Sequence, residues 1–246
     1  MSENFFDVSA FAYAHRGLWG GRVPENSLAA FHSARSHGVG AELDVRLSAD
    51  GVPHVFHDAT LQRMCGVAAA LDSLTAKELE SVFLPNGFPI PKLEDVLAIM
   101  GDLPVLIELK IDAPGGELAE RVAGLIEGHP GRMTVMSFDE PTVARLCQLV
   151  TDRSVGLLIA AEPLLGADVV RAKAAKGRAM GCDYLAPQLT SLATASELAG
   201  GLPLVTWTLR DPVDLELARK HAAAPIFEGF SPSLVPGLAK PGGTPI

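Results

Sequence analysis

The 246-residue sequence has few cysteines, little basic charge and no basic cluster. Its three cysteines, Cys65, Cys147 and Cys182, are far apart and odd in number, which disfavours both a zinc site and a disulfide framework. Lys and Arg number 20 against 29 Asp and Glu, which gives a formal net charge of −9. A chain of this charge is a poor candidate for binding nucleic acid or an anionic membrane surface.

Targeting and membrane-spanning segments are also missing from the pattern. The first residues lack the basic start and apolar core of a secretory signal. The most apolar later stretch, residues 155–170, is interrupted by Glu162, Pro163 and Asp168, which argues against a spanning helix. We therefore expect a cytoplasmic protein without stable membrane insertion, and the sequence leaves its oligomeric state open.

What the sequence does contain is a regular alternation of apolar runs and helical stretches. Hydrophobic residues make up 48% of the chain and the mean hydropathy is +0.25, as in a compact globular protein. The runs predicted as strands cover residues 12–15, 40–47, 104–109, 132–137, 154–160, 182–186, 203–207 and 224–227, and those predicted as the later helices cover 93–100, 116–127, 140–150, 165–179, 191–199 and 212–221. The strands are apolar nearly throughout, which is typical of a parallel sheet covered by helices.

Eight strand–helix units in a chain of this length predict an α/β fold, a single (β/α)8 TIM barrel over residues 1–246. An open doubly wound sheet is the alternative, but no dinucleotide-binding glycine pattern supports it. Residues 58–90 are rich in Pro and Gly and predict only one short helix, capped by Thr75. We interpret them as a small insertion that leaves the main fold after the second strand.

Two carboxylates within the predicted strand 40–47 point to metal chemistry. Glu42 and Asp44 are two residues apart, so both side chains lie on one face of the strand. Buried side by side without a partner, they could not both stay ionised, whereas a shared Mg²⁺ or Ca²⁺ would accept their oxygens. The alternatives are two solvated acids on a half-exposed strand, or a hydrogen-bond network without metal.

Other polar side chains collect where the predicted strands end. They are His15, Arg16, His57, Asp58, Glu108, Lys110, Ser137, Gln188 and Trp207. In a (β/α)8 barrel these ends meet at one face, which is where such enzymes place their active residues. A single histidine at a strand end is more often a structural, hydrogen-bonded residue, but the set as a whole favours a site.

The residue types in this set fit one reaction. Glu42, Asp44 and Glu108 can hold a divalent cation, Mg²⁺ or Ca²⁺. Arg16 suits a phosphate through bidentate hydrogen bonds and Lys110 through its point charge. His15 and His57 can give and take protons near neutral pH, although the sequence does not say which is acid and which is base. Together they describe hydrolysis of a small-molecule phosphodiester.

The sequence also resembles the glycerophosphodiester phosphodiesterase family over about residues 12–210. The resemblance rests on His15-Arg16-Gly17, Pro24-Glu25-Asn26, Glu42-Leu43-Asp44-Val45, Asp50-Gly51, His57-Asp58 with Thr60-Leu61 and Arg63, Leu74-Thr75 to Leu79, Ile90-Pro91-Lys92-Leu93-Glu94, Glu108-Leu109-Lys110, Ser137-Phe138 and Trp207-Thr208. It implies a (β/α)8 barrel with an insertion at about 58–90 and cleavage of glycerophosphodiesters to sn-glycerol 3-phosphate and an alcohol. It also implies metal ligation by Glu42, Asp44 and Glu108, proton transfer by His15 and His57, and phosphate contacts from Arg16 and Lys110.

The chain departs from the family pattern at two places. Where the family commonly has Trp-Thr-Val-Asn, this chain has Trp207-Thr208-Leu209-Arg210, and the last strand reads Phe227-Glu228-Gly229 in place of a Thr-Asp ending. We expect both departures to lie away from the metal and phosphate positions, where they could alter the pocket for the alcohol half of the substrate or the packing of the barrel's closing seam. Trp207 is expected to form a wall of the substrate pocket rather than only to fill the core. Arg210 could be a second phosphate contact, but we expect a solvated residue at a helix start. Glu25 could contact the site, but we expect it only to favour a helix N-terminus.

Two competing functions stay open at this stage. A phospholipase D-like phosphotransferase would use the same site on lysophospholipids and release a cyclic phosphate, but residues 58–90 show no exposed apolar stripe for a lipid. A catalytically silent phosphate-binding protein is the other alternative. Such a protein has no chemical need for both histidines, the three acids and Lys110.

Overall fold

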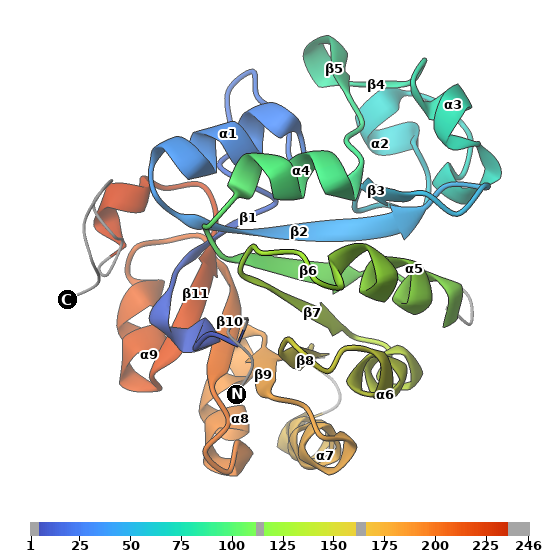
Figure 1. Ribbon diagram of the computed structural model, residues 1–246. Helices are drawn as coiled ribbons and strands as arrows, with labels where there is room; N and C mark the ends of the chain where they lie inside the picture. Colours follow the sequence, from blue (N-terminus) through green and yellow to red (C-terminus); the bar gives the residue numbers. More distant parts are fainter. Residues whose placement is uncertain (1–4, 112–115, 161–165, 236–246) are drawn as a thin grey trace.

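The computed structural model describes residues 5–111, 116–160 and 166–235, and within them eight parallel strands close into a barrel (Figure 1). The strands are β1 (Tyr13–His15), β2 (Gly40–Leu47), β6 (Val105–Leu109), β7 (Met133–Ser137), β8 (Val155–Ile159), β9 (Tyr184–Pro187), β10 (Leu204–Leu209) and β11 (Ala223–Phe227). Each pairs with the next in this order, and β11 pairs back with β1. The closed ring confirms the predicted (β/α)8 class and rules out the open doubly wound sheet.

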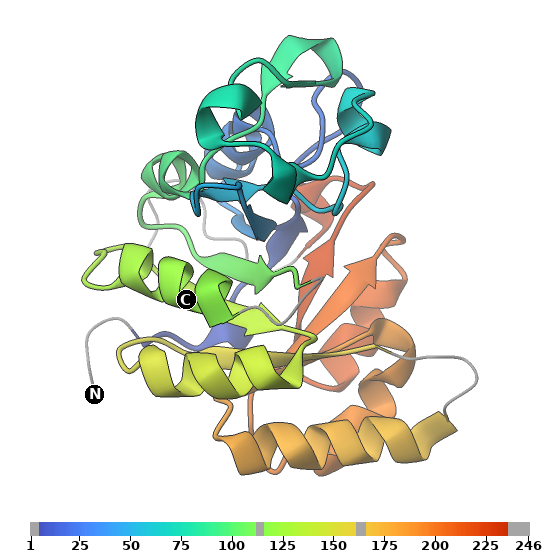
Figure 2. The same cartoon turned by 90° about the vertical axis from the view of Figure 1, so that its right-hand side faces the viewer.

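Helices follow the strands and pack around the outside of the ring (Figures 1 and 2). They are α1 (Leu28–Ser36), α4 (Leu93–Met100), α5 (Gly116–Ile126), α6 (Glu140–Leu149), α7 (Gly166–Met180), α8 (Leu192–Leu198) and α9 (Asp214–Lys220). These spans agree with the predicted helices to within a few residues. No helix in the described ranges combines the length and the apolar character needed to cross a bilayer, and Glu162 and Pro163 lie outside those ranges.

The barrel strands divide their side chains between two apolar layers. On β2, Leu43 and Val45 belong to the core between strands and helices, which also contains residues of α1 and α4. A second cluster, with Tyr13, Tyr184 and Ile226 among its members, comes from barrel strands and fills the interior. Because side chains alternate along a strand, Glu42 and Asp44 point away from the helices and into the barrel.

Residues 58–91 stand apart from the ring of helices, beyond the end of β2 (Figures 1 and 2). After β3 (Pro53–Val55), which is antiparallel to β2, they form the short elements α2 (Gln62–Cys65), α3 (Ala76–Leu79), β4 (Phe83–Leu84) and β5 (Phe88–Pro89). Thr75 caps α3 as predicted, in a capping box with Glu78. The prediction of one helix in an otherwise irregular segment was incomplete, because elements of two to four residues carry no detectable periodicity.

This segment has a small apolar core of its own. Leu61, Leu71, Leu79 and Leu84 are buried there together with Phe56 from the end of β3. The segment is therefore packed and ordered rather than a loose loop. Its first residues, directly after β3, lie at the end of the barrel where the polar side chains gather.

Candidate active site

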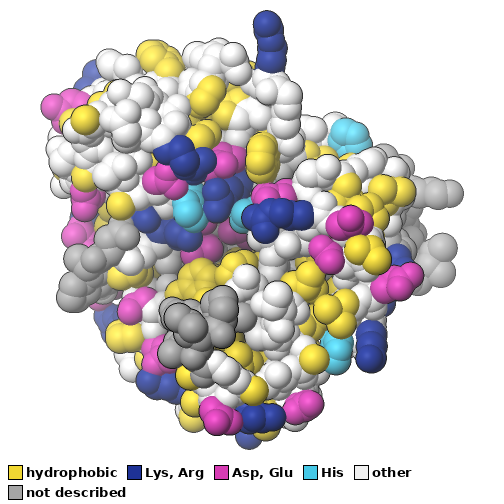
Figure 3. All heavy atoms as spheres, turned by 180° about the vertical axis from the view of Figure 1, so that it is seen from behind, with side chains coloured by type: hydrophobic (Ala, Val, Ile, Leu, Met, Phe, Trp, Pro, Cys, Tyr) yellow, Lys and Arg dark blue, Asp and Glu magenta, His cyan; other side chains and the backbone are white. Residues whose placement is uncertain are grey.

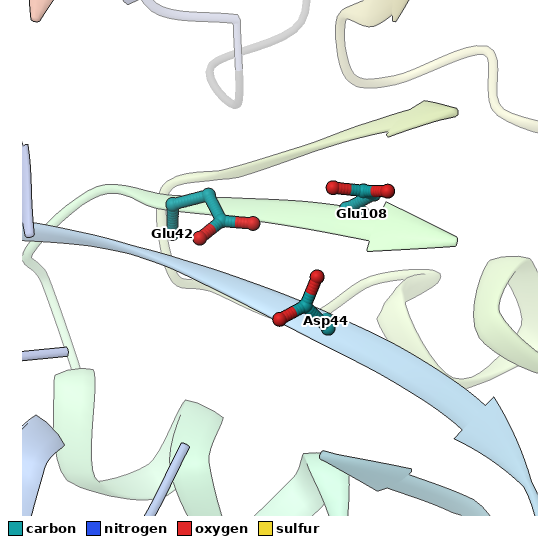
Figure 4. Close-up of side chains that lie close together, drawn as sticks. All are labelled: Glu42, Asp44 and Glu108. Atoms are coloured by element: carbon teal, nitrogen blue, oxygen red, sulfur yellow. The ribbon is translucent and has the colours of Figure 1, made fainter. Parts of the chain in front are cut away.

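The register of the barrel strands brings the three carboxylates together. His15 lies opposite Glu42 in the β1–β2 pairing, and Asp44 lies opposite Glu108 in the β2–β6 pairing. One oxygen from each of the three acids lies within 4.8 Å of the others, and all three side chains are buried (Figure 4). The geometry of this acidic cluster, Glu42, Asp44 and Glu108, is thus set by the sheet rather than by a loop.

Two cations lie against the acidic cluster. Lys110 Nζ is 2.7 Å from Glu108 Oε1 and 3.5 Å from Asp44 Oδ1. Arg16 Nε is 3.2 Å from Asp44 Oδ2, and the Arg16 backbone N–H donates to Glu42 Oε2 at 3.1 Å. Both residues that the sequence assigns to a phosphate are therefore beside the acids, within reach of a ligand bound there.

The electrostatics of the cluster are unbalanced. Burial and the Asp44 and Glu108 carboxylates hold the pKa of Glu42 well above its usual value, and burial with Asp44 raises the pKa of Glu108 to about 7. Burial also acts to raise the pKa of Asp44, but Lys110 and Arg16 outweigh it and lower that pKa. Lys110 and Arg16 thus keep Asp44 ionised, but they do not supply enough positive charge to offset the raised pKa values of Glu42 and Glu108.

The donor atoms present fit a hard divalent cation. Asp44 Oδ1 and Asn26 Oδ1 are buried oxygens that accept no hydrogen bond from any described residue. Three carboxylates with an orphaned oxygen among them form the all-oxygen set that Mg²⁺ and Ca²⁺ prefer. The cluster therefore fits such an ion, and the positive charge the acids lack is what an ion would bring.

His57 reaches the site from the end of β3. Its Nδ1 lies 2.7 Å from Asp58 Oδ1, and Arg46 Nε–H donates to the His57 carbonyl oxygen at 2.8 Å. Burial lowers the pKa of His57; Lys110 adds to this effect, and Asp44 and Asp58 offset it only in part. With Nδ1 committed to Asp58, Nε2 is the ring nitrogen available for proton exchange.

Glu25 lies in an ion-pair network that the sequence does not predict. Its Oε1 is 2.8 Å from Arg16 Nη1 and 2.6 Å from Arg63 Nη2, and Arg63 Nε is 2.5 Å from Asp58 Oδ2. The expectation that Glu25 serves to favour a helix N-terminus is wrong, because it is buried and bound to two arginines. Arg63, from the segment after β3, therefore binds both Glu25, the partner of Arg16, and Asp58, the partner of His57.

Asn26 and Ser27 divide two roles between them. Ser27 caps α1 through its side chain, which accepts the Ala30 N–H. Asn26 instead donates its Nδ2 to Asp44 Oδ2 at 2.9 Å. A Pro-Glu-Asn-Ser run before a helix predicts capping only, so this contact could not be read from the sequence.

Both departures from the family pattern were expected away from the metal and phosphate positions, but one of them, Glu228, lies against His15. His15 Nδ1 lies 2.5 Å from Glu228 Oε2, directly beyond β11. The other Glu228 oxygen, Oε1, lies 2.7 Å from Arg210 Nε. Arg210 is exposed, as expected for a solvated residue, but it also pairs with Glu228. Neighbouring strand ends, β1 and β11, bring these residues together, and that pairing was not visible in the sequence.

Trp207 joins the site indirectly. Its ring packs edge-on against Phe138 at 5.3 Å, and Lys110 Nζ lies 5.9 Å from the centre of the Phe138 ring. Trp207 Nε1 donates to the Ala186 carbonyl, which fixes the indole. Ser137, also expected at a strand end, bonds the Leu109 carbonyl and serves the backbone. The pocket-wall role of Trp207 stays a prediction.

The site has the composition of an anion-processing centre. On the face shown in Figure 3, basic, acidic and histidine side chains gather in a depression near its middle. His15 and His57 each have Nδ1 on a carboxylate, and Arg16 and Lys110 lie on the acidic cluster. Two anchored imidazoles, two cations and an oxygen cage can bind a phosphate ester and exchange protons with it.

Comparisons with known proteins agree with this chemistry. The model of the Glycerophosphoryl diester phosphodiesterase family matches residues 15–228. A probable glycerophosphodiester phosphodiesterase 2 from Mycobacterium tuberculosis is 36% identical over 143 residues, which cover 58% of this chain and 53% of that protein. The chain therefore spans about half the length of that relative.

Solved structures show the same fold. A glycerophosphodiester phosphodiesterase from Thermotoga maritima superposes with a TM-score of 0.72 at 27% identity, covering 88% of this chain and 93% of its own. A phosphodiesterase from Oleispira antarctica, solved with the product sn-glycerol-3-phosphate, superposes with a TM-score of 0.78 at 22% identity. The match covers 89% of this chain and 92% of that one. At 22% identity, the similarity to the Oleispira antarctica structure shows a shared fold only.

Proposed function

This chain belongs to the glycerophosphoryl diester phosphodiesterase family, and from that premise we propose that it hydrolyses glycerophosphodiesters to sn-glycerol 3-phosphate and an alcohol. The observation that carries the proposal is the convergence of three buried carboxylates with two imidazoles whose Nδ1 atoms are held by other carboxylates. A binding protein has no need for paired proton-transfer groups, whereas hydrolysis requires one group to take a proton and another to give one.

The chain's own residues divide the work. Arg16 and Lys110 bind non-bridging oxygens of the phosphate, the former through a planar fork of donors and the latter through a point charge. The Nε2 atom of one histidine takes a proton from water or from the adjacent glycerol hydroxyl as that oxygen bonds to phosphorus. The Nε2 atom of the other gives a proton to the departing alcohol oxygen as its bond to phosphorus breaks. If the glycerol hydroxyl attacks, the product is a cyclic phosphate, and water then adds to phosphorus and breaks one ring P–O bond to give sn-glycerol 3-phosphate.

Glu42, Asp44 and Glu108 would hold a divalent cation, which supplies charge stabilisation for the phosphate when bound. Support comes from the all-oxygen donor set and from the shortage of positive charge around Glu42 and Glu108. Mg²⁺ and Ca²⁺ both suit such a set. Choosing between them is a task for titration of the metal-free protein with each ion in turn.

The test is a panel of glycerophosphodiesters with choline, ethanolamine, glycerol and inositol as the alcohol. Each is incubated with the protein in EDTA, Mg²⁺ or Ca²⁺, and the products are identified by phosphorus NMR. We expect glycerol 3-phosphate from at least one ester, only with an ion present. Cyclic phosphate from a lysophospholipid would instead identify the phosphotransferase.

Variants separate catalysis from folding. H57A and E42A should lose turnover while keeping the wild-type circular dichroism spectrum, because both side chains act at the site. H32A is the matched control, since His32 is exposed on α1 outside the site. Near-wild-type turnover by H57A, or no product from any ester with either ion, would refute the proposed function.

The organisation as one domain over residues 1–246, with an insertion at about 58–90, stays a prediction, as does a cytoplasmic location. Support for the former comes from contacts between the segment after β3 and the barrel: Arg63 with Glu25, and Asn86 Nδ2 with the Arg22 carbonyl. A single cooperative transition in urea, seen identically by fluorescence and circular dichroism, is the expected result.

A further inference from the structure

Glu228 occupies an unusual position between His15 and Arg210. The β1–β11 pairing places Ala14 opposite Phe227, so the next residues along the chain, His15 at the end of β1 and Glu228 just after β11, lie side by side. Glu228 Oε2 lies 2.5 Å from His15 Nδ1 while Oε1 lies 2.7 Å from Arg210 Nε. Both carboxylate oxygens are therefore engaged, one by the ring and one by the arginine.

The His15 ring bridges Glu228 and the acidic cluster. Its other nitrogen, Nε2, lies 3.9 Å from Glu42 Oε2. A neutral imidazole has one N–H and one lone pair, and a carboxylate oxygen accepts hydrogen bonds only. Only Nδ1 lies within hydrogen-bond distance of a carboxylate oxygen, so the proton of the neutral ring belongs on Nδ1, facing Glu228, and the lone pair on Nε2.

The geometry points to Glu228 as a positioning residue that, held by Arg210, fixes His15 in the tautomer with its proton on Nδ1. The effect of this tautomer on catalysis rests on the proposed function, whereas the orientation of the His15 ring does not. Arg210 matters because it engages Oε1 and so leaves Oε2 as the oxygen aimed at the ring. The Trp19 indole N–H, which donates to the His15 carbonyl at 3.0 Å, holds the backbone of the same residue.

The same arrangement occurs a second time in the site. His57 Nδ1 faces Asp58 at 2.7 Å, and Asp58 Oδ2 faces Arg63 Nε at 2.5 Å. Each of the two imidazoles thus carries a carboxylate on Nδ1 and an arginine behind that carboxylate. The two sets come from different parts of the chain, since one closes the β11–β1 seam and the other begins the segment after β3.

Burial acts to raise the pKa of Glu228, but His15 and Arg210 outweigh it and lower that pKa. Glu228 is therefore an ionised acceptor over the neutral pH range. An acceptor without a proton cannot bond a bare ring nitrogen, which reinforces the assignment of the proton to His15 Nδ1. Arg210 thus contributes to the charge of Glu228 as well as to its orientation.

The decisive variant is E228Q. Arg210 requires an oxygen, so the amide carbonyl turns to Arg210 and the NH₂ group faces His15 Nδ1, which forces the ring proton onto Nε2. By analogy with other histidine-orienting carboxylates, we expect kcat to fall at least about 100-fold while KM changes less than about threefold. E120Q is the matched control, because Glu120 forms an exposed ion pair with Arg145 and the chemical change is the same.

A double variant distinguishes positioning from simple structural damage. In R210A/E228Q the amide is free to rotate, so its carbonyl can accept the Nδ1 proton again. We therefore expect the double variant to be more active than E228Q, by about tenfold. If the two substitutions damaged the structure independently, their reductions in kcat would multiply, and the double variant would be less active than either single variant.

The tautomer is measured directly by ring ¹⁵N–¹H correlation spectra of the Mg²⁺-supplemented protein at about pH 8.5, above the usual imidazole range. Loss of a signal set in H15A identifies the His15 ring. We expect the pattern of protonated Nδ1 in wild type and of protonated Nε2 in E228Q. This measurement needs no turnover, so it stands even where the panel of esters gives no product. An unchanged tautomer in E228Q, or multiplying losses in the double variant, would overturn the inference.

Discussion

Arg16 and Asn26 share a backbone conformation that long side chains rarely adopt. Their φ angles are 58° and 55°, in the left-handed region that Asn accepts more readily than Arg. At Arg16 this turn aims the backbone N–H at Glu42 and the guanidinium Nε at Asp44. Local strain of this kind persists only where surrounding contacts fix it, and here those contacts are to the acidic cluster.

Replacing Asn26 by Asp tests how sensitive the acidic cluster is to charge. The change turns a donor to Asp44 into a second acceptor at 2.9 Å, in a buried position. In EDTA we expect N26D to lose about 2 kcal/mol of stability, which lowers the melting temperature by about 4–8 °C. Mg²⁺ or Ca²⁺ should recover most of that loss, because a cation satisfies both acids. Calorimetry with and without the ion measures both effects.

Asn86 provides the control for that substitution. It also has a left-handed φ, 62°, and its Nδ2 also donates to an oxygen, the Arg22 carbonyl, but it is exposed. N86D should change the melting temperature by a degree or two at most, equally in EDTA and in Mg²⁺. An N26D protein as stable as wild type in EDTA would contradict the electrostatic account of the cluster.

Arg63 makes stability depend on pH with a definite sign. Burial acts to raise the pKa of Asp58, but hydrogen bonds from Arg63 and His57 lower it to about 2. A carboxyl group whose folded pKa lies below its unfolded value of about 3.9 stabilises the fold above that value, and this contribution is lost as the pH falls toward about 2. The Arg63 side chain is half exposed, so solvent screening reduces the gain to about 1 kcal/mol.

R63M should therefore unfold more easily than wild type at pH 7, by about 1 kcal/mol in urea. The difference should shrink as the pH is lowered from about 4 toward about 2, because Asp58 then becomes protonated in both proteins. R145M, which breaks an exposed helix ion pair, is the comparison and should show a small difference at every pH. A difference between R63M and wild type that stays constant down to the acid transition would contradict the role given to Asp58.

At the scale of secondary structure, the sequence predicts the barrel well because its elements are long and strongly apolar. The strands are continuous apolar runs, the helices between them are long enough to show a period of 3.6, and the order of these elements leaves few topologies. Of the short elements after β3 only α3 was predicted, and the others were missed because their burial depends on contacts with each other rather than on local pattern. Propensity alone carries little information over four residues.

The candidate site divides in the same way. Residues at strand ends were predictable because parallel strands of a barrel present them at one face. Glu228 and Glu25 were not, because their importance depends on which strands are neighbours and on where a long side chain reaches. The closing β1–β11 pair joins residues more than 200 positions apart, as in the contact of His15 with Glu228. A single sequence contains no signal for such a contact.

The loop from β1 to α1 offers a test of close packing between elements. A Cβ on Gly17 would lie 2.8 Å from the Ala30 Cβ on α1, and the Gly17 φ is +80°. G17A should therefore cost about 2–3 kcal/mol, from steric overlap added to backbone strain, as measured by urea unfolding. G21A in the same loop has a similarly positive φ but nothing within 4 Å, so it should cost only about 1 kcal/mol. Equal losses would show that overlap with α1 contributes nothing.

For the whole molecule, net charge sets a condition on function. The chain carries a formal charge of −9, yet its proposed substrate is an anion. Arg16 and Lys110 form ion pairs with the acidic cluster, which neutralises part of their positive charge. Attraction of a phosphodiester therefore depends on local positive charge, to which a divalent ion would make the largest contribution.

That condition links the ion to global stability as well as to catalysis. An ion that binds only the folded chain, at a free concentration of about 100 times its Kd, raises the free energy of unfolding by about 2.7 kcal/mol. For a protein of this size we expect Mg²⁺ or Ca²⁺ to raise the melting temperature by about 5–10 °C relative to EDTA. E42Q should abolish this response and, in EDTA, should melt no lower than wild type, because it removes one of three crowded acids.

The comparison of these melting temperatures separates a metal site from a structural network of acids. E120Q removes a carboxylate from the exposed pair with Arg145 and should respond to the ions as wild type does. If the three acids served only to hold Arg16 and Lys110, E42Q would be destabilised in EDTA and neither ion would change the melting temperature of wild type. A rise confined to proteins that retain Glu42 requires an ion at the acidic cluster, because only there do three buried carboxylates of the described chain converge.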